Sequence, residues 1–156
     1  MERIILISDN HGNEKIVNKI LSQEEYDLSI HLGDSENNSK WANSLFDYAV
    51  RGNNDFNDLK DEIFFEYKGK KFMILHGHTR GIYVHNWQDL PQKVAKQENV
   101  DIIIHGHSHI PYFNKEDNII SVCPGSPTLP RSEFGPSYAI LNIDGENIDV
   151  ELKQVI

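Results

Sequence analysis

Short apolar runs alternate with amphipathic segments along the first third of the chain. Residues 4–7 form an apolar run that ends in polar residues, which is typical of a buried strand. Apolar positions then recur at helical spacing over residues 16–21, and Asn13 precedes them as a candidate N-cap. The same alternation predicts a strand at 28–30, a helix with Trp41, Leu45 and Phe46 on one face, and a strand at 48–50. This β-α-β-α-β opening predicts parallel strands with right-handed crossovers.

The pattern changes in the middle of the chain. Two apolar runs flank Lys68-Gly69-Lys70, which predicts a hairpin, and Leu90-Pro91 suits the first turn of a helix. Asp144-Gly145 marks a second hairpin. We find no linker or repeat, and we expect one domain over residues 1–156, an α/β fold with two sheets and a partly antiparallel C-terminal part. The remaining strands are expected at 63–65, 72–75, 102–104, 112–113, 119–122, 138–143 and 148–152.

Composition narrows the class of protein. The chain has 156 residues, of which 38% are hydrophobic and 25% charged, and this balance predicts a globular domain with a proper core. The net charge of −9 argues against binding of extended nucleic acid, although bound metal ions would still let an acidic enzyme act on phosphates. No apolar run approaches the roughly 20 residues that span a bilayer, and the N-terminal run is too short for a signal peptide. With Cys123 as the single cysteine, we expect a cytoplasmic protein with no membrane contact.

Potential metal ligands follow several of the predicted strands. The carboxyl ends of strands in an open α/β sheet share one edge, so residues far apart in sequence can meet there. Glycines at 33, 52, 77 and 106 adjoin these residues and allow the chain to turn sharply. Imidazole with carboxylate suits zinc, manganese or iron better than calcium, and together they predict a two-metal hydrolytic centre. The seven candidate ligands are Asp9, His11, Asp34, Asn53, His76, His107 and His109.

Each candidate ligand also has an ordinary structural explanation. Asp9 and His11 could form a capping pair, Asp34 and Asn53 could be turn residues, and His76 could be a hydrogen-bonded core histidine. The joint occurrence of all seven, with His107 and His109 on one side of an extended segment, favours the metal centre. We expect four further residues to have structural roles. His105 would be a strand residue, Trp41 and Trp87 would be packing residues, and Cys123 would be a small buried residue. The histidines outside the ligand set are His31, His78, His85 and His105.

The ordered set of motifs resembles a known family. Asp-x-His, Gly-Asp, Gly-Asn, His-Gly and Gly-His-x-His follow one another as in the calcineurin-like metallophosphoesterase superfamily. Length, compact spacing and the Pro124-Gly125-Ser126…Pro130-Arg131 segment are similar to its small YfcE-like phosphodiesterase branch. The resemblance covers essentially the whole chain. It implies a four-layer α-β-β-α sandwich with two mixed β-sheets.

The resemblance also implies a mechanism. A hydroxide between two divalent ions would attack phosphorus in line, with Asp34 as the bridging carboxylate. Manganese is the ion usually associated with this branch, and zinc, iron or nickel would also suit the ligands. One ion would be held by Asp9, His11, Asp34 and His109, and the other by Asp34, Asn53, His76 and His107.

The chain departs from the wider family pattern after Asn53. Many members carry a histidine at the next position, where this chain has Asn54, which can donate a hydrogen bond to a phosphoryl oxygen but cannot deliver a proton. We therefore expect diesters with good leaving groups to react faster than alkyl phosphates. The candidate catalytic residues are Asp34, Asn54 and His78. Asn54, His78 and Arg131 are the candidates for substrate contacts, and Arg80 could also neutralise a phosphate. The loop at 124–131 suits an active-site wall or a subunit contact.

These observations favour a metal-dependent phosphodiesterase that acts on a small phosphorylated substrate. A phosphomonoesterase or nuclease could use the same centre. A non-catalytic protein-interaction scaffold is the alternative from a different class, because the resembling superfamily includes a eukaryotic retromer subunit that mainly binds partners. All seven ligand positions hold competent residues, which favours the enzyme. A homo-oligomer, either dimer or tetramer, is also consistent with the resemblance.

Overall fold

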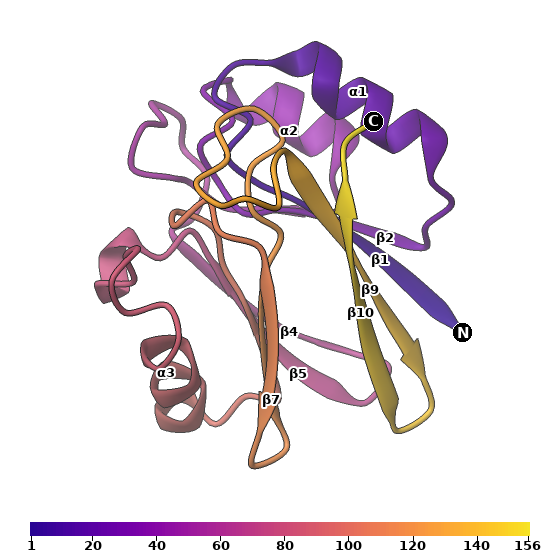
Figure 1. Cartoon of the computed structure of the whole chain (residues 1–156), viewed down its shortest axis with the longest axis vertical. Helices are drawn as coiled ribbons and strands as arrows, with labels where there is room; N and C mark the ends of the chain where they lie inside the picture. Colours follow the sequence, from indigo (N-terminus) through magenta and orange to yellow (C-terminus); the bar gives the residue numbers. More distant parts are fainter.

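The computed structural model describes all of residues 1–156 as two five-stranded mixed sheets with helices on their outer faces (Figure 1). The first sheet has the order β10-β9-β1-β2-β3 and the second has the order β4-β5-β6-β8-β7. The first sheet comprises β1 (Glu2–Ile7), β2 (Leu28–His31), β3 (Tyr48–Ala49), β9 (Ser137–Asp144) and β10 (Asn147–Gln154). The second comprises β4 (Glu62–Tyr67), β5 (Lys70–Leu75), β6 (Ile102–Ile104), β7 (Tyr112–Glu116) and β8 (Ile119–Cys123). The helices are α1 (Glu14–Gln23), α2 (Ser39–Leu45), α3 (Leu90–Glu98) and the 3-10 turn η1 (His78–Arg80).

The apolar runs of β1 and β5 are continuous because both faces of each strand are buried. Ile4 and Leu6 of β1 face the core between the sheets, whereas Ile5 and Ile7 face α1 and α2. In the same way β5 contributes alternate residues to the central core and to the layer beneath α3. Strands covered on both faces are expected to lack polar alternation. The expected four-layer α-β-β-α sandwich is therefore confirmed.

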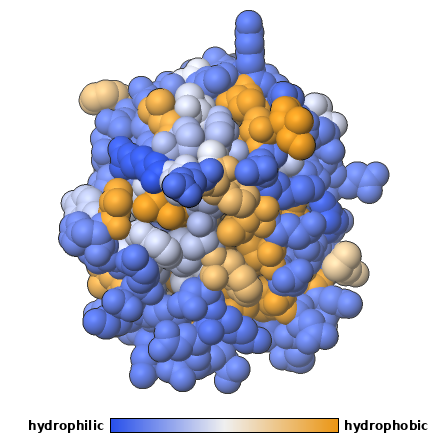
Figure 2. Space-filling view, in the orientation of Figure 1, coloured by the Kyte–Doolittle hydropathy of each residue, from blue (hydrophilic) through white to orange (hydrophobic).

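Strand pairing also confirms the predicted topology. β1 pairs in parallel with β2, and β2 pairs in parallel with β3. The two predicted hairpins are present, as antiparallel pairs β4–β5 and β9–β10. Asn13 caps α1 by accepting a hydrogen bond from the backbone N–H of Ile16 at 3.1 Å. Figure 2 shows a mostly polar face on which apolar side chains gather near the centre. None of the helices is long and apolar enough to cross a membrane.

Two local features differ from the sequence-based expectation. Phe46 was expected in the second helix, but it adopts an extended conformation just after α2. Its ring packs edge-on against that of His31, with 5.0 Å between the ring centres, and is buried in the layer beneath the helices. The 3-10 turn η1 directly after β5 was not expected either. It lies between Gly77 and Gly81, which both have positive φ angles.

The strand ends of the two sheets meet at one place. The N–H of Asp9, after β1, donates to the carbonyl of Gly33, after β2, at 2.9 Å. The N–H of Gly106, after β6, donates to the carbonyl of His76, after β5, at 3.0 Å. The N–H of His107 then reaches the Asp9 carboxylate at 3.1 Å and joins the two sheets. The convergence expected from strand-end positions therefore occurs.

Candidate metal centre

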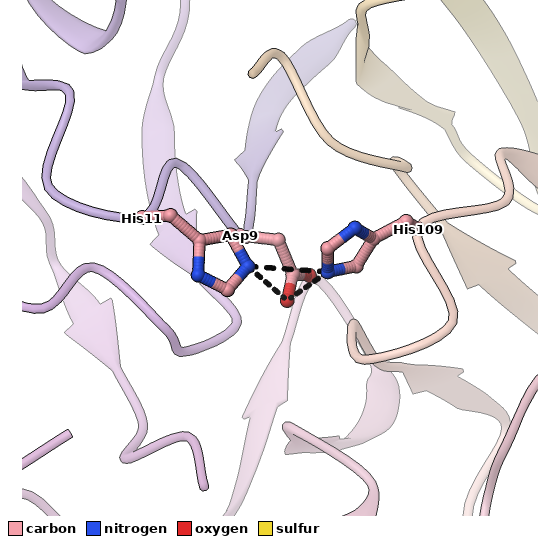
Figure 3. Close-up of side chains that lie close together, drawn as sticks. All are labelled: Asp9, His11 and His109. Atoms are coloured by element: carbon pink, nitrogen blue, oxygen red, sulfur yellow. Dashed lines mark hydrogen bonds and ion pairs between the residues drawn. The ribbon is translucent and has the colours of Figure 1, made fainter. Parts of the chain in front are cut away.

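The Asp9 carboxylate lies at the middle of a histidine cluster and is fully buried. Its Oδ1 atom lies 3.2 Å from Nε2 of His109 and 3.9 Å from Nε2 of His11 (Figure 3). The same atom lies 3.7 Å from Nε2 of His76. Oδ1 has no hydrogen-bond partner, whereas Oδ2 accepts hydrogen bonds from the Ser8 hydroxyl and the His107 N–H. A buried carboxylate oxygen without a partner is costly unless a cation or proton compensates it.

Asp34 is the second buried carboxylate of the cluster. Its Oδ2 atom lies 3.2 Å from Nε2 of His76 and 3.9 Å from Nε2 of His11. Two groups of close potential ligands result, Asp9 with His11 and His109, and Asp9 with Asp34 and His76, each with its ligand atoms within 4.8 Å of one another. Asp9 is common to both groups, and Asp34 approaches a histidine of each.

Three histidines are oriented by their Nδ1 atoms. Nδ1 of His76 lies 2.7 Å from the carbonyl of Leu32, and Nδ1 of His109 lies 2.6 Å from the carbonyl of Leu129. Nδ1 of His11 lies 2.6 Å from the Glu36 carboxylate. Because these oxygens can only accept, each Nδ1 is the protonated donor and each Nε2 is directed at the carboxylates. Metal-binding histidines are held in this way by outer hydrogen bonds.

The electrostatics of the cluster favour a positive charge. Burial alone would lower the pKa of His76, but the charge of Asp9 and the hydrogen bond with Asp34 outweigh it and raise the pKa to about 9. Burial would raise the pKa of Asp34, and here the hydrogen bond with His76 outweighs burial and lowers it. The pKa of Asp9 is lowered too, because His76 and His109 outweigh burial. The carboxylates stay ionised, and the donor set fits a divalent cation.

His107 and Asn53, the other two expected ligands, differ in position. Nδ1 of His107 lies 3.2 Å from Nε2 of His76. Burial and the neighbouring His76 lower the pKa of His107 to about 4, so its imidazole is neutral near pH 7. Asn53 lies in the loop after β3 and is exposed. The structure therefore brings Asp9, His11, Asp34, His76, His107 and His109 together, and the role of Asn53 as a ligand stays a prediction.

Backbone strain gathers at the same residues. Five of the expected ligands have φ angles in the left-handed region, between 44° and 73°. Such a conformation costs a residue other than glycine about 1–3 kcal/mol and persists only where the surroundings impose it. Its concentration at one cluster supports a functional site. The five are Asp9, His11, Asp34, His107 and His109.

The expected substrate-contacting residues surround the cluster. Asn54 donates from its backbone N–H and its side-chain amide to Asp34, at 2.9 and 3.1 Å. The His78 ring lies 5.5 Å from that of His76, and its buried Nδ1 has no partner. Burial and His76 lower the pKa of His78. Arg131 is exposed and lines a hollow beside His107. Arg80 instead pairs with Glu62 and Glu98, so it is a structural arginine.

Asp55 is a residue of the site that the sequence pattern did not single out. Its buried carboxylate accepts hydrogen bonds from the backbone N–H groups of Asp34 at 2.9 Å, Gly52 at 2.7 Å and Glu36 at 2.8 Å. These bonds hold the loops after β2 and β3 against each other. In sequence, Gly52-Asn53-Asn54-Asp55 indicates only a turn. The three N–H partners become apparent only in three dimensions.

The loop at residues 124–131 lies against the cluster. The hydroxyl of Ser126 donates to the carbonyl of Asp9 at 2.7 Å, and that of Thr128 donates to the carbonyl of Asn10 at 3.1 Å. The carbonyl of Leu129 orients His109, as described above. The loop thus supports two ligand segments from outside, which fits the expected wall of the site.

The buried His105, which was expected to be a strand residue, lies just after β6. Its Nδ1 lies 2.8 Å from the carbonyl of Gly106, and its Nε2 lies 2.7 Å from the hydroxyl of Tyr112. We expect His105→Ala to keep nearly the full metal content while losing about 1–3 kcal/mol of stability, because the buried Tyr112 hydroxyl loses its partner. Elemental analysis and urea unfolding would check both. Loss of one metal equivalent would show that His105 belongs to the ligand set.

His31 is expected to make the fold sensitive to mild acid. Its Nε2–H donates to Oδ1 of Asn10 at 2.7 Å, and its Nδ1 accepts from the N–H of Gly33 at 3.1 Å. Burial disfavours the charged imidazole and lowers the pKa of His31 from 6.5 to about 4. Between these values the unfolded chain binds the extra proton, so stability falls as pH decreases from 6.5 towards 4.

This contribution can be isolated with His31→Gln. From pH 7 to 5, linkage at this one histidine should cost about 2 kcal/mol. The stability lost over that interval should therefore be smaller in the variant by about this amount. Urea unfolding at the two pH values measures it, and equal losses in both proteins would contradict a neutral, buried His31.

Comparison with known proteins gives the class to which this fold and site belong. The family model described as "Calcineurin-like phosphoesterase superfamily domain" matches residues 2–146 of this chain. The "Probable metallophosphoesterase YsnB" of Bacillus subtilis is 37% identical over 149 residues, covering 92% of this chain and 85% of that protein. "Phosphodiesterase MJ0936" of Methanocaldococcus jannaschii is 26% identical over 145 residues, covering 79% and 82%. The chain therefore belongs to the calcineurin-like phosphoesterase superfamily.

Solved structures agree with this class. A Streptococcus pneumoniae protein described as a predicted phosphoesterase superposes with a TM-score of 0.84 at 28% identity, covering 98% of this chain and 89% of that one. Vps29 of Chaetomium thermophilum superposes with a TM-score of 0.74 at 19% identity, covering 97% and 95%. The second likeness shows the shared fold alone.

Proposed function

We propose that this protein is a metal-dependent phosphodiesterase that hydrolyses a small phosphorylated substrate at the Asp9–Asp34 cluster. The observation that carries the proposal is the pair of buried carboxylates facing the Nε2 atoms of three oriented histidines. Membership of a phosphoesterase superfamily supports hydrolysis of a phosphate ester. The name of the M. jannaschii relative supports diesters in particular.

The cluster is proposed to bind two divalent ions, with manganese the first candidate and zinc, iron or nickel the others. When bound, the ions would acidify a water molecule and neutralise the charge of the reacting phosphate. Asp34 is the proposed shared ligand, because its carboxylate approaches both His11 and His76. Asn53 enters the set by its motif position alone. The proposed sets are Asp9, His11, Asp34 and His109 for one ion, and Asp34, Asn53, His76 and His107 for the other.

The surrounding side chains would orient the substrate. The Asn54 amide and a neutral His78 can each donate one hydrogen bond to a phosphoryl oxygen. The lowered pKa of His78 leaves it without a spare proton near pH 7, so neither residue protonates a leaving group. Arg131 would add positive charge at the edge of the site. Diesters with good leaving groups should therefore react fastest.

The first experiment compares bis-p-nitrophenyl phosphate with p-nitrophenyl phosphate on chelator-stripped protein. Manganese, zinc, iron, nickel or magnesium is then added back. Metal-restored turnover with a preference for the diester supports the proposal and identifies a working ion. A preference for the monoester would make the protein a phosphatase, and cleavage of oligonucleotides would make it a nuclease that uses the same centre.

A non-catalytic scaffold is the second candidate function. The likeness to Vps29 supports it at the level of the fold. Stoichiometric metal binding without turnover of any of these substrates would favour it. We also propose a cytoplasmic location, which the single cysteine, Cys123, supports because the chain needs no internal disulfide. Size-exclusion chromatography with light scattering would test the expected dimer or tetramer.

A further inference from the structure

A hollow of about 330 Å³ opens directly beside the candidate metal centre. Its volume is at the lower end of the range for small-molecule sites, about 300–1,000 Å³. His107 belongs to both places, because it lines the hollow and its ring lies 4.9 Å from that of His76. An ester group of a phosphate held at the centre can therefore extend into the hollow. The lining residues are Tyr83, Val84, His85, His107 and Arg131.

One wall of the hollow is aromatic. The Tyr83 ring lies 5.8 Å from that of His85 at an angle of 10°, and 5.1 Å from that of His107 at 59°. Tyr83 is 43% exposed and the neighbouring Val84 is 44% exposed. Exposed rings and an aliphatic side chain next to a polar centre form a surface that suits another planar, apolar group.

The aromatic wall is held in place by the loop that carries it. Ile82 is fully buried, and its N–H donates to the carbonyl of Gly77 at 3.0 Å. The Tyr83 N–H donates to Oδ1 of Asn86 at 2.7 Å, and Nδ2 of the same asparagine donates to the carbonyl of Gly81 at 2.8 Å. A binding surface that is ordered beforehand loses less entropy when a ligand binds.

The charge of the hollow suits an anion although the chain carries a net charge of −9. Its lining contains the positively charged Arg131, and it contains no carboxylate. Arg3, Arg51 and Arg80 form ion pairs within the chain, whereas Arg131 forms none. A second hollow, on the Asn54 side of the centre, is lined by Glu36 and three asparagines together with Phe56, and it is less suited to a negatively charged substrate.

We propose that the Tyr83 hollow binds a planar aromatic group carried on the non-leaving ester oxygen of a phosphodiester substrate. Tyr83 would set specificity by contact with the ring, and Arg131 would lie near the negative charge of the diester. The substrate class is then an aryl-like or nucleobase-bearing diester rather than a small alkyl diester. This inference rests on the proposed function, since it concerns the same centre.

The test keeps the leaving group constant and changes only the other ester group. Methyl, phenyl and thymidine 5′ diesters of p-nitrophenol are compared on metal-loaded protein. The phenyl and thymidine esters should show kcat/KM about tenfold above that of the methyl ester, which corresponds to about 1.4 kcal/mol. Tyr83→Ala should reduce this ratio to about twofold or less, because a single aromatic contact contributes only a modest binding free energy. The matched control is Phe56→Ala, which removes the fully exposed aromatic side chain of the other hollow and should leave the ratio unchanged.

Binding of diphenyl and dimethyl phosphate, followed by NMR on the same metal-loaded proteins, separates the inference from the proposed function. Tighter binding of diphenyl phosphate that depends on Tyr83, without turnover of any ester, would keep the subsite and overturn the phosphodiesterase. Turnover in which wild type and Tyr83→Ala show the same ratio of phenyl-ester to methyl-ester kcat/KM would overturn the proposed subsite and leave the proposed phosphodiesterase activity intact. A ratio that depends on Phe56 would place the aromatic group in the other hollow. A change of oligomeric state in Tyr83→Ala, with the ratio unchanged, would make this surface a subunit contact.

Discussion

Asp34→Asn is expected to lower metal-restored diester turnover at least a hundredfold while the chain still folds. The amide has nearly the shape of the carboxylate, but it lacks the charge that faces Nε2 of His76 at 3.2 Å and Nε2 of His11 at 3.9 Å. A loss of about 100-fold corresponds to about 2.7 kcal/mol of transition-state stabilisation, which is modest for a ligand that we propose is shared by two ions. Turnover, metal content by elemental analysis and far-UV circular dichroism would be measured together.

Two further variants make this prediction specific. Asp144→Asn removes an exposed carboxylate at the end of β9, and it should leave turnover and metal content unchanged. Asp9→Asn changes the carboxylate that is common to both groups of close ligands. If Asp34→Asn kept near-native metal content and turnover while Asp9→Asn lost both ions, the shared ligand would be Asp9 and our assignment of Asp34 would be wrong.

The layered fold could be predicted because its strongest signals are local. Residues 4–7 and 72–75 are continuous apolar runs, as expected for strands buried on both faces. Asn13 indicated the start of α1 through capping chemistry that involves only neighbouring residues. The 3-10 turn η1 has no comparable local signal. Arg80 connects it by ion pairs to Glu62 and Glu98, far away in sequence, and spacing does not indicate such partners.

The convergence of the site was predictable for a similar reason, whereas its detailed chemistry was not. Strand-end positions were enough to expect Asp9, Asp34 and His76 in one place. They do not indicate which imidazole nitrogen faces the carboxylates, because Leu32 and Leu129 decide this through their carbonyl oxygens. The exposed position of Asn53, the support from Asp55 and the hollow beside Tyr83 depend on how separate loops pack. Those contacts exist only after the sheets have formed.

Gly52→Ala is expected to disrupt the centre without changing any proposed ligand. A Cβ atom at this position would lie 2.8 Å from Cγ of Asp34 and closer still to Oδ1 and N of the same residue. The loops cannot easily separate, because Asp55 binds the N–H groups of both Gly52 and Asp34. The added methyl group should therefore displace the Asp34 carboxylate, lower stability by about 1–3 kcal/mol and reduce metal content and turnover at least tenfold.

The matched control for Gly52→Ala is Gly69→Ala in the β4–β5 turn. Gly69 has a φ of +79°, but a Cβ there would meet nothing within 4 Å. Left-handed strain should cost this variant about 1–2 kcal/mol, a loss similar to that of Gly52→Ala, without moving a ligand. Urea unfolding would show whether the two variants have lost similar amounts of stability, and elemental analysis would then compare their metal content. If both variants kept full metal and turnover, the Asp34 loop would tolerate displacement, and its close packing against Gly52 would not be needed for the centre.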